Sequence, residues 1–266
     1  MLKTVVITRP EGPYGGAQQL STSIKSLGLT PYHLRVLRCE ALELSKESQR
    51  TVIDFLQQGA GWVVFLSPTS VYIFRDLCGR LLPGRSIERG LPIAAQGIGT
   101  VEAVKNCFGR TADFVPTTFV AEVFAEEFLR ELETFVNRDR EVLVPQSADG
   151  RDVFAPILRD KGFVVRSVAS YRTVEIELAS SELQSFKGLD PDSTCIVFMS
   201  PSAVRAAVNA LSSHPGALQR LRAISVGPIT SQAMRDCGLL VAGEAVEHSE
   251  AGVIELLRAQ LGVTKG

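Results

Sequence analysis

The chain has 266 residues, of which 45% are hydrophobic and 21% charged, and its mean hydropathy is +0.14. This balance allows a sizeable buried core and excludes a disordered, collagen-like or coiled-coil chain, while the length suits two domains of ordinary size. The 28 Lys and Arg residues against 29 Asp and Glu residues leave a formal net charge of −1, so no overall field attracts nucleic acid or an anionic membrane.

Short apolar segments alternate with longer amphipathic segments along the chain. The apolar segments predict strands at residues 4–8, 30–36, 62–66, 92–95, 112–115, 141–144, 163–168, 194–199, 223–226 and 239–242. The amphipathic segments predict helices between them, for example at 16–27, 49–58, 120–132, 151–161 and 250–261. This alternation predicts an α/β fold with mainly parallel sheets.

Two pairs of similar segments indicate an internal duplication. Residues 65–71 (FLSPTSV) and 198–204 (FMSPSAV) are identical at four of seven positions. Residues 97–100 (GIGT) and 227–230 (GPIT) each follow a short predicted strand and precede a predicted helix. The second repeat is therefore expected to begin near residues 137–140.

The repeated segments have the pattern of helix starts at the carboxyl ends of strands. Ser67-Pro68 and Ser200-Pro201 combine a favoured N-cap residue with proline at the first helical position, and capping alone would explain them. However, parallel sheets bind ligands at this edge, where helix N-termini attract anions. These two starts and the glycine segments at Gly97 and Gly227 would together suit a ligand with several dispersed carboxylates.

The sequence lacks the motifs of several functional classes. There is no GxxxxGK[ST] loop and no GxGxxG after a strand, which disfavours ordinary nucleotide binding. The three histidines lie outside the repeated segments, and we predict surface or structural roles for them. The five cysteines are far apart and form no CxxC, which predicts a reducing cytoplasm and no metal site. The sequence shows no signal peptide and no apolar run long enough for a membrane span.

Residues 30–44 and 164–178 are two extended runs of 15 residues each, whereas typical strands have about five or six. Each run is predicted to leave one sheet and continue as a connector, with the pair meeting around residues 34–40 and 168–174. This predicts interleaved domains, one made of residues 1–36 and 173–266 and the other of residues 37–172. The second run contains the polar segment Ser170-Tyr171-Arg172-Thr173.

In their order and spacing, these motifs resemble those of the uroporphyrinogen-III synthase family. The matching segments are VVITRP at 5–10, FLSPTSV at 65–71, GIGT at 97–100, SADGR at 147–151, SYRTV at 170–174, FMSPSAV at 198–204 and SVGPITSQAM at 225–234. Gln146 departs from the arginine that members often carry.

The resemblance implies two flavodoxin-like α/β domains joined by a two-stranded β connector, with a cleft between them. It implies a cytoplasmic, cyclising hydro-lyase that closes linear hydroxymethylbilane to uroporphyrinogen III, with loss of water and inversion of ring D. The resemblance also implies that the reaction needs no metal and no organic cofactor. The expected partner is this octacarboxylate substrate, with the enzyme that supplies it as a second candidate partner, and the chain is expected to be a monomer.

The resemblance also assigns candidate site residues. Tyr171 is the catalytic candidate, because a phenol with an ordinary pKa of about 10 stays protonated at neutral pH and can donate to the departing hydroxyl. A tyrosine packed in the connector is the structural alternative. The implied substrate-binding residues are Arg9, Ser67, Thr69, Gly97, Thr100, Ser147, Arg151, Ser200, Ser202, Gly227 and Thr230.

Two other functions stay open on the sequence alone. The first is a non-catalytic two-domain protein that binds a polycarboxylate metabolite, and the second is a dinucleotide-dependent enzyme. Turnover of hydroxymethylbilane without metal or cofactor separates the synthase from both.

Overall fold

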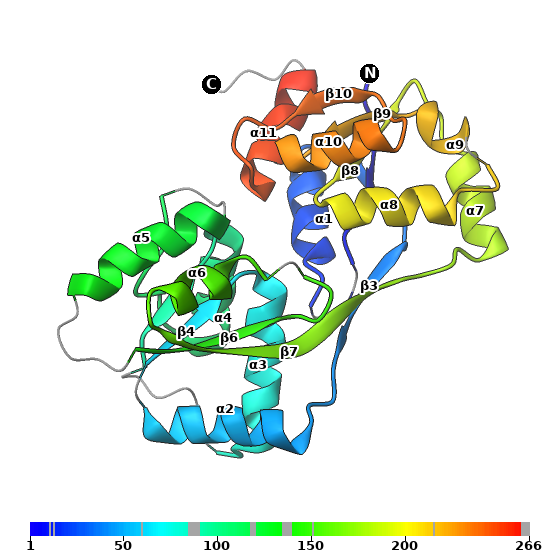
Figure 1. Cartoon of the computed structure of the whole chain (residues 1–266). Coiled ribbons are helices and arrows are strands. Elements are labelled where there is room, and N and C mark those ends of the chain that lie inside the picture. Colours follow the sequence, from blue (N-terminus) through cyan, green and yellow to red (C-terminus); the bar gives the residue numbers. More distant parts are fainter. Residues whose placement is uncertain are drawn as a thin grey trace. The chain divides into compact units, whose positions relative to one another are not determined.

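The computed structural model describes residues 1–10, 12, 14–59, 61–84, 91–117, 121–134, 140–150, 152–214 and 216–261 (Figure 1). The chain divides into two compact units. Unit 1 comprises Met1–Cys39 and Val174–Gly266, and unit 2 comprises Glu40–Thr173.

Unit 1 is built on a parallel sheet of five strands in the order β10-β9-β8-β1-β2. The strands are β1 (Thr4–Ile7), β2 (Thr30–His33), β8 (Thr194–Phe198), β9 (Arg222–Ser225) and β10 (Val241–Glu244). The helices are α1 (Ala17–Ser26), α7 (Ser180–Lys187), α8 (Pro201–Ala210), α9 (Gly216–Gln219), α10 (Pro228–Asp236) and α11 (Glu250–Leu261).

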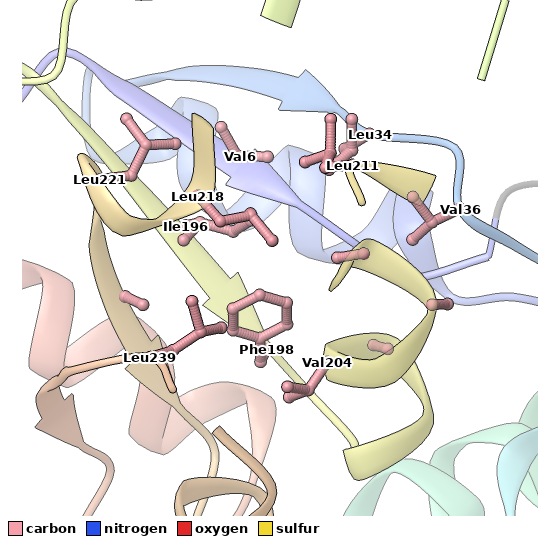
Figure 2. Close-up of a cluster of buried hydrophobic side chains, with 14 of the residues drawn as sticks. Val6, Leu34, Val36, Ile196, Phe198, Val204, Leu211, Leu218, Leu221 and Leu239 are labelled. Atoms are coloured by element: carbon pink, nitrogen blue, oxygen red, sulfur yellow. The ribbon is translucent and has the colours of Figure 1, made fainter. Parts of the chain in front are cut away.

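Both faces of the unit 1 sheet are covered by helices, because its central strands are apolar at successive positions. Val6, Ile196 and Phe198 point to the face that α7, α8, α9 and α10 cover, in the cluster shown in Figure 2. Val5 and Val197, at the intervening positions, pack with α1 and α11 on the opposite face. Since side chains alternate along a strand, uninterrupted apolar runs predict this double coverage.

Unit 2 holds the second sheet, in the order β3-β7-β6-β4-β5. Its strands are β3 (Leu37–Ala41), β4 (Trp62–Phe65), β5 (Ile93–Ala95), β6 (Glu141–Ser147) and β7 (Val164–Glu175). Its helices are α2 (Lys46–Gln58), α3 (Pro68–Leu81), α4 (Ile98–Phe108), α5 (Ala121–Thr134) and α6 (Phe154–Asp160). Val63 and Phe65 pack with α2, α3 and α4, whereas Trp62 and Val64 pack with α5 and α6 on the other face.

The two sheets share one strand order once the duplication is considered. In unit 1 the order is β2-β1-β8-β9-β10, and in unit 2 it is β7-β6-β4-β5 followed by a parallel bridge between Ala94 and Phe114. In the duplication, β4 corresponds to β8 and β5 corresponds to β9. The pair β6-β7 has the same position in the unit 2 sheet as the pair β1-β2 has in the unit 1 sheet. Each sheet therefore combines strands from both repeats in the order 2-1-3-4-5, which is the flavodoxin-like order.

Most predicted elements are present, and the predicted α/β class with parallel sheets is confirmed. The predicted strand at 112–115 is wrong in extent, because only Phe114 forms an isolated bridge there. The extended run at 30–44 is interrupted between β2 and β3, where the Val36 N–H bonds to the Leu34 carbonyl (2.9 Å) in a tight turn. The other run forms the single 12-residue strand β7.

The chain passes from one unit to the other within β3 and within β7. The Ile176 N–H bonds to the Val36 carbonyl (2.9 Å) and the Leu42 N–H bonds to the Ser170 carbonyl (2.9 Å). Because one residue number rises as the other falls, these two strands run antiparallel, unlike the other neighbours in the sheet. We propose that this pair is the connector and that unit 2 folds independently.

Candidate functional site

The carboxyl ends of the strands form the edge at which open α/β sheets bind ligands, at the point where the strand order reverses. In unit 1 the chain progresses from β1 to β2 in one direction and from β8 to β10 in the other, so the reversal lies between β1 and β8. In unit 2 it lies between β4 and β6. Arg9 and Ser200 follow the two central strands of unit 1, while Ser67 follows β4 and Ser147 ends β6. Four candidate residues thus lie at the reversal points.

Ser67 and Ser200 cap the helices that open at these points. The Ser67 Oγ accepts a hydrogen bond from the Ser70 N–H (3.2 Å), and the Ser200 Oγ accepts one from the Ala203 N–H (3.2 Å). Their backbones are also alike, with φ, ψ of −159°, 155° at Ser67 and −163°, 156° at Ser200. The expected capping is therefore present in both repeats, which leaves each hydroxyl with one proton for a further contact.

Tyr171 contacts one of the two capping serines. Its hydroxyl lies 2.9 Å from the Ser67 Oγ, and the side chain is 8% exposed. The register of β6 and β7 shifts after Gln146, so that Ser147 pairs with Tyr171. This irregularity breaks the alternation of β7 and lets two consecutive residues, Ser170 and Tyr171, both be buried. Tyr171, Ser67 and Ser147 are thereby brought together at the edge of the unit 2 sheet.

The start of α4 is a second element at this edge. Gly97 precedes the helix with φ +90°, a conformation that favours glycine. The buried Thr100 hydroxyl donates to the Gln96 carbonyl at 2.6 Å. This bond ties the hydroxyl to the end of β5, so the geometry favours a structural role for the Thr100 side chain.

We expect Thr100→Val to lower the free energy of unfolding by about 0.5–1.5 kcal/mol, because the Gln96 carbonyl loses its donor. The affinity for uroporphyrinogen III, the product that the resemblance implies, should not change. Denaturant unfolding and product titration measure the two quantities on one preparation. A weaker affinity with unchanged stability would show that this hydroxyl binds the ligand instead.

In unit 1, Gly227 begins α10 in close contact with His248. Its φ of 167° is extended and accessible to any residue, so backbone strain does not explain the glycine. A Cβ at this position would lie 2.9 Å from the His248 Cδ2 and 3.0 Å from its Cγ, so the imidazole lies directly against the main chain. His248 therefore lies at this edge, whereas the sequence predicted only a surface or structural role for it. Thr230, in the first turn of α10, is buried.

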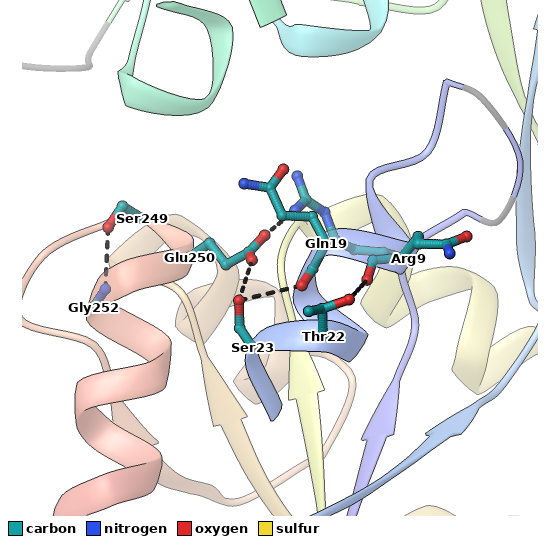
Figure 3. A network of polar contacts seen from close by, with 8 residues as sticks. Arg9, Gln19, Thr22, Ser23, Ser249, Glu250 and Gly252 are labelled. Atoms are coloured by element: carbon teal, nitrogen blue, oxygen red, sulfur yellow. Dashed lines mark hydrogen bonds and ion pairs between the residues drawn. The ribbon is translucent and has the colours of Figure 1, made fainter. Parts of the chain in front are cut away.

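Arg9 lies in a charged network at the end of β1 (Figure 3). Its Nη1 is 2.9 Å from the Glu250 Oε2, and the Ser23 hydroxyl donates to the Glu250 Oε1 at 3.2 Å. Both charged side chains are partly buried. A substrate carboxylate at Arg9 would therefore share the guanidinium with Glu250, which weakens the net attraction that a lone arginine would supply.

Each unit collects one group of candidate residues. Unit 2 holds Ser67, Thr69, Gly97, Thr100, Ser147 and Tyr171, and unit 1 holds Arg9, Ser200, Ser202, Gly227 and Thr230. Ser202 lies in the first turn of α8, where its Oγ is 2.9 Å from the Ser200 Oγ. Arg151 lies outside the described residues.

Exposed apolar side chains at the same edges were not predicted from the sequence. In unit 2, Ile98 begins α4 and is 46% exposed, and Val115 follows the Phe114 bridge and is 40% exposed. In unit 1, Ile229 lies in the first turn of α10 and is 64% exposed, and Val246 follows β10 and is 100% exposed. Each edge thus places apolar side chains beside the main-chain N–H groups of a helix start.

The described residues contain no group of three or more His, Cys, Asp or Glu side chains arranged to hold a metal ion. None of the five cysteines, all of which lie among the described residues, forms a disulfide bond, and burial raises the pKa of both Cys78 and Cys195 to about 12. These two thiols are therefore protonated and unreactive at neutral pH. Over the same described ranges, no helix combines the length and the apolar character needed to cross a membrane.

Comparison with known structures identifies similar folds. A uroporphyrinogen-III synthetase from Helicobacter pylori is 15% identical, with a TM-score of 0.61 over 97% of this chain and 100% of that chain. A mutant uroporphyrinogen III synthase from the extremely thermophilic bacterium Thermus thermophilus is 16% identical, with a TM-score of 0.57 over 98% of this chain and 99% of that chain. At these identities the likeness establishes the fold alone.

The family of the chain is shown by similarity in sequence. Curated protein sequences gave no match. The family model described as Uroporphyrinogen-III synthase HemD matches residues 18–255, a range that includes every candidate residue except Arg9. The chain therefore belongs to the uroporphyrinogen-III synthase family of tetrapyrrole biosynthesis.

Proposed function

We propose that the protein is a cofactor-independent uroporphyrinogen-III synthase, a hydro-lyase that closes hydroxymethylbilane to uroporphyrinogen III with loss of water and inversion of ring D. The observation that carries this proposal is the family match over residues 18–255, which includes Tyr171 and the helix starts of both units. The proposal also makes the protein a cytoplasmic monomer, with the enzyme that supplies hydroxymethylbilane as a candidate partner.

The chemistry of the two sheet edges supports an octacarboxylate ligand. Helix N-termini offer main-chain N–H groups and a partial positive charge, each worth about 0.3–1 kcal/mol to a nearby anion. Helices α3, α4, α8 and α10 are among those that begin at the carboxyl edges of the two sheets. Because the Arg9 guanidinium is shared with Glu250, we assign most carboxylate binding to main-chain groups.

The exposed apolar side chains suit the other part of this substrate, its four pyrrole rings. A side chain that is exposed without ligand gains about 25 cal/mol for each Å² of apolar area that the ligand covers. Within each unit, a carboxylate at the helix start would bring its adjoining ring onto the exposed isoleucine there, Ile98 in unit 2 or Ile229 in unit 1. Alternating polar and apolar contacts would hold a flexible linear bilane in a folded conformation.

Replacing Ile98 or Ile229 by serine is expected to raise KM for hydroxymethylbilane about threefold to tenfold, because apolar contact with the pyrrole rings is lost. Stability should change little, since both side chains are exposed. Leu240→Ser is the matched control, because Leu240 is exposed at the amino end of β10, away from the carboxyl edge. If KM in all three variants equals that of the wild type, these isoleucines do not contact the substrate.

The proposed reaction needs little protein chemistry beyond proton donation and positioning. The lone pair of the terminal pyrrole nitrogen expels the hydroxyl as the C–O bond breaks, and Tyr171 gives its proton so that water departs. Ring closure on the resulting azafulvenium cation later releases one proton from the attacked pyrrole, and this proton restores the phenol. Selection of the inverted isomer rests on how the bilane is held.

Turnover separates this function from simple binding. After exhaustive EDTA treatment and with no added cofactor, the protein is expected to consume hydroxymethylbilane faster than a heat-denatured sample. A non-catalytic polycarboxylate-binding protein would show a raised melting temperature with uroporphyrinogen, while hydroxymethylbilane would disappear at the uncatalysed rate.

A further inference from the structure

The two repeats differ in what their capping serine contacts. Ser67 and Ser200 share the following proline, the backbone conformation and a 3.2 Å cap bond. The second contact of Ser67 is the Tyr171 hydroxyl, whereas that of Ser200 is the Ser202 hydroxyl, each at 2.9 Å. Aligning residues 30–44 with 164–178 places Leu37 opposite Tyr171, so the matching position carries no phenol.

The cap bond restricts how Ser67 can serve Tyr171. The Ser70 N–H occupies one lone pair of the Ser67 Oγ, which leaves one lone pair and one proton. When Tyr171 gives up its proton, the phenolate oxygen can only accept hydrogen bonds. From that moment the bond between the two oxygens must run from the Ser67 O–H to Tyr171.

This direction stabilises the charge that develops on Tyr171. A hydrogen bond to a charged oxygen is stronger than one to a neutral oxygen, so the Ser67–Tyr171 bond strengthens as the proton leaves. Ser67 also lies at the N-terminus of the 14-residue helix α3, whose partial positive charge favours a nearby anion. Both effects act more strongly in the transition state than in the ground state, and only such effects raise kcat.

We propose that Ser67 is a positioning residue for Tyr171, donating its hydroxyl proton to the phenol oxygen as Tyr171 protonates the departing hydroxyl, and that the duplicated Ser200 has no such role. This inference rests on the proposed synthase function and deepens it. Proton donation is then confined to unit 2, although both units keep the same capped helix start. Ser67 acts through Tyr171 and does not itself bind the substrate.

A double-mutant cycle tests the inference on the full chain. Ser67→Ala is expected to lower kcat about fivefold with KM unchanged, and to cause almost no further loss in a Tyr171→Phe background. If Ser67→Ala does not fold properly, Ser67→Gly is the substitute, because glycine at an N-cap costs little stability. It also removes the hydroxyl and should lower kcat by the same factor. Ser67→Thr keeps a hydroxyl and should restore most of the rate.

Ser200→Ala is the matched control, because it removes an equivalent cap. It should lower the melting temperature about as much as Ser67→Ala does, and its effect on kcat should be the same with and without the Tyr171 hydroxyl. Multiplicative effects of Ser67 and Tyr171 replacements in a wild-type protein that turns over would overturn the positioning role. A wild-type protein that fails to turn over hydroxymethylbilane would overturn the proposed function, and this inference with it.

Discussion

Tyr171→Phe is expected to lower the turnover of hydroxymethylbilane about tenfold to a hundredfold. Loss of a positioned general acid typically costs about 10² to 10⁴ in rate, and the ability of the bilane to expel its own hydroxyl reduces that loss. KM should change little, because the phenol is 8% exposed and, in the proposed mechanism, acts on the leaving group only. Steady-state kinetics of the variant, with kcat and KM determined separately, measure the effect.

Tyr32→Phe is the control for this prediction. The Tyr32 hydroxyl bonds to the Glu182 carbonyl at 3.3 Å, and burial, with a smaller contribution from Glu182, raises its pKa, so it is also a partly buried, protonated phenol. It is not part of either group of candidate residues. Its removal should leave kcat unchanged, and equal kcat values for Tyr171→Phe and wild type would reduce Tyr171 to a packing residue.

The fragment of residues 37–172 is expected to fold alone and to melt cooperatively. It contains β3 to β7 almost entirely, with the helices that cover both faces of their sheet. Its boundaries lie within three residues of those of unit 2, Glu40–Thr173. Circular dichroism during thermal unfolding is the measurement, with a single transition expected.

The fragment of residues 1–136 is the control, because it contains nearly the whole first repeat. It separates β1 from β8 and β4 from β6, so both sheets lose a central neighbour and expose apolar strand residues. We expect it to lack a cooperative transition. Folding of 1–136 together with failure of 37–172 would show that the sequence repeats are the folding units and that the connector assignment is wrong.

Local sequence patterns predicted much of this fold because their physical causes are local. Ser-Pro pairs after apolar runs predicted the starts of α3 and α8, and the cap bonds span only three residues. Uninterrupted apolar runs predicted the central strands β4 and β8, which are buried at every position. At 112–115, Phe114 forms an isolated bridge to Ala94 and no regular strand, a difference that depends on neighbours elsewhere in the chain.

The contacts within the candidate site depend on long-range geometry. Ser67 and Tyr171 are 104 residues apart, and their 2.9 Å contact follows from the order of β4, β6 and β7 and from the register shift after Gln146. Arg9 and Glu250 are 241 residues apart, so local sequence patterns could not predict their ion pair either. Apart from the family resemblance, the only signal in the sequence was chemical type, since hydroxyl, phenol and guanidinium groups followed predicted strands.

The ratio of uroporphyrinogen III to uroporphyrinogen I formed from hydroxymethylbilane is the most direct test of whether the protein is a uroporphyrinogen-III synthase. Products can be oxidised to porphyrins and separated by chromatography, with a heat-denatured sample giving the uncatalysed ratio. We expect the protein to yield the inverted isomer III almost exclusively, after EDTA treatment and without cofactor. Isomer I as the main product, formed at the uncatalysed rate, would contradict this expectation.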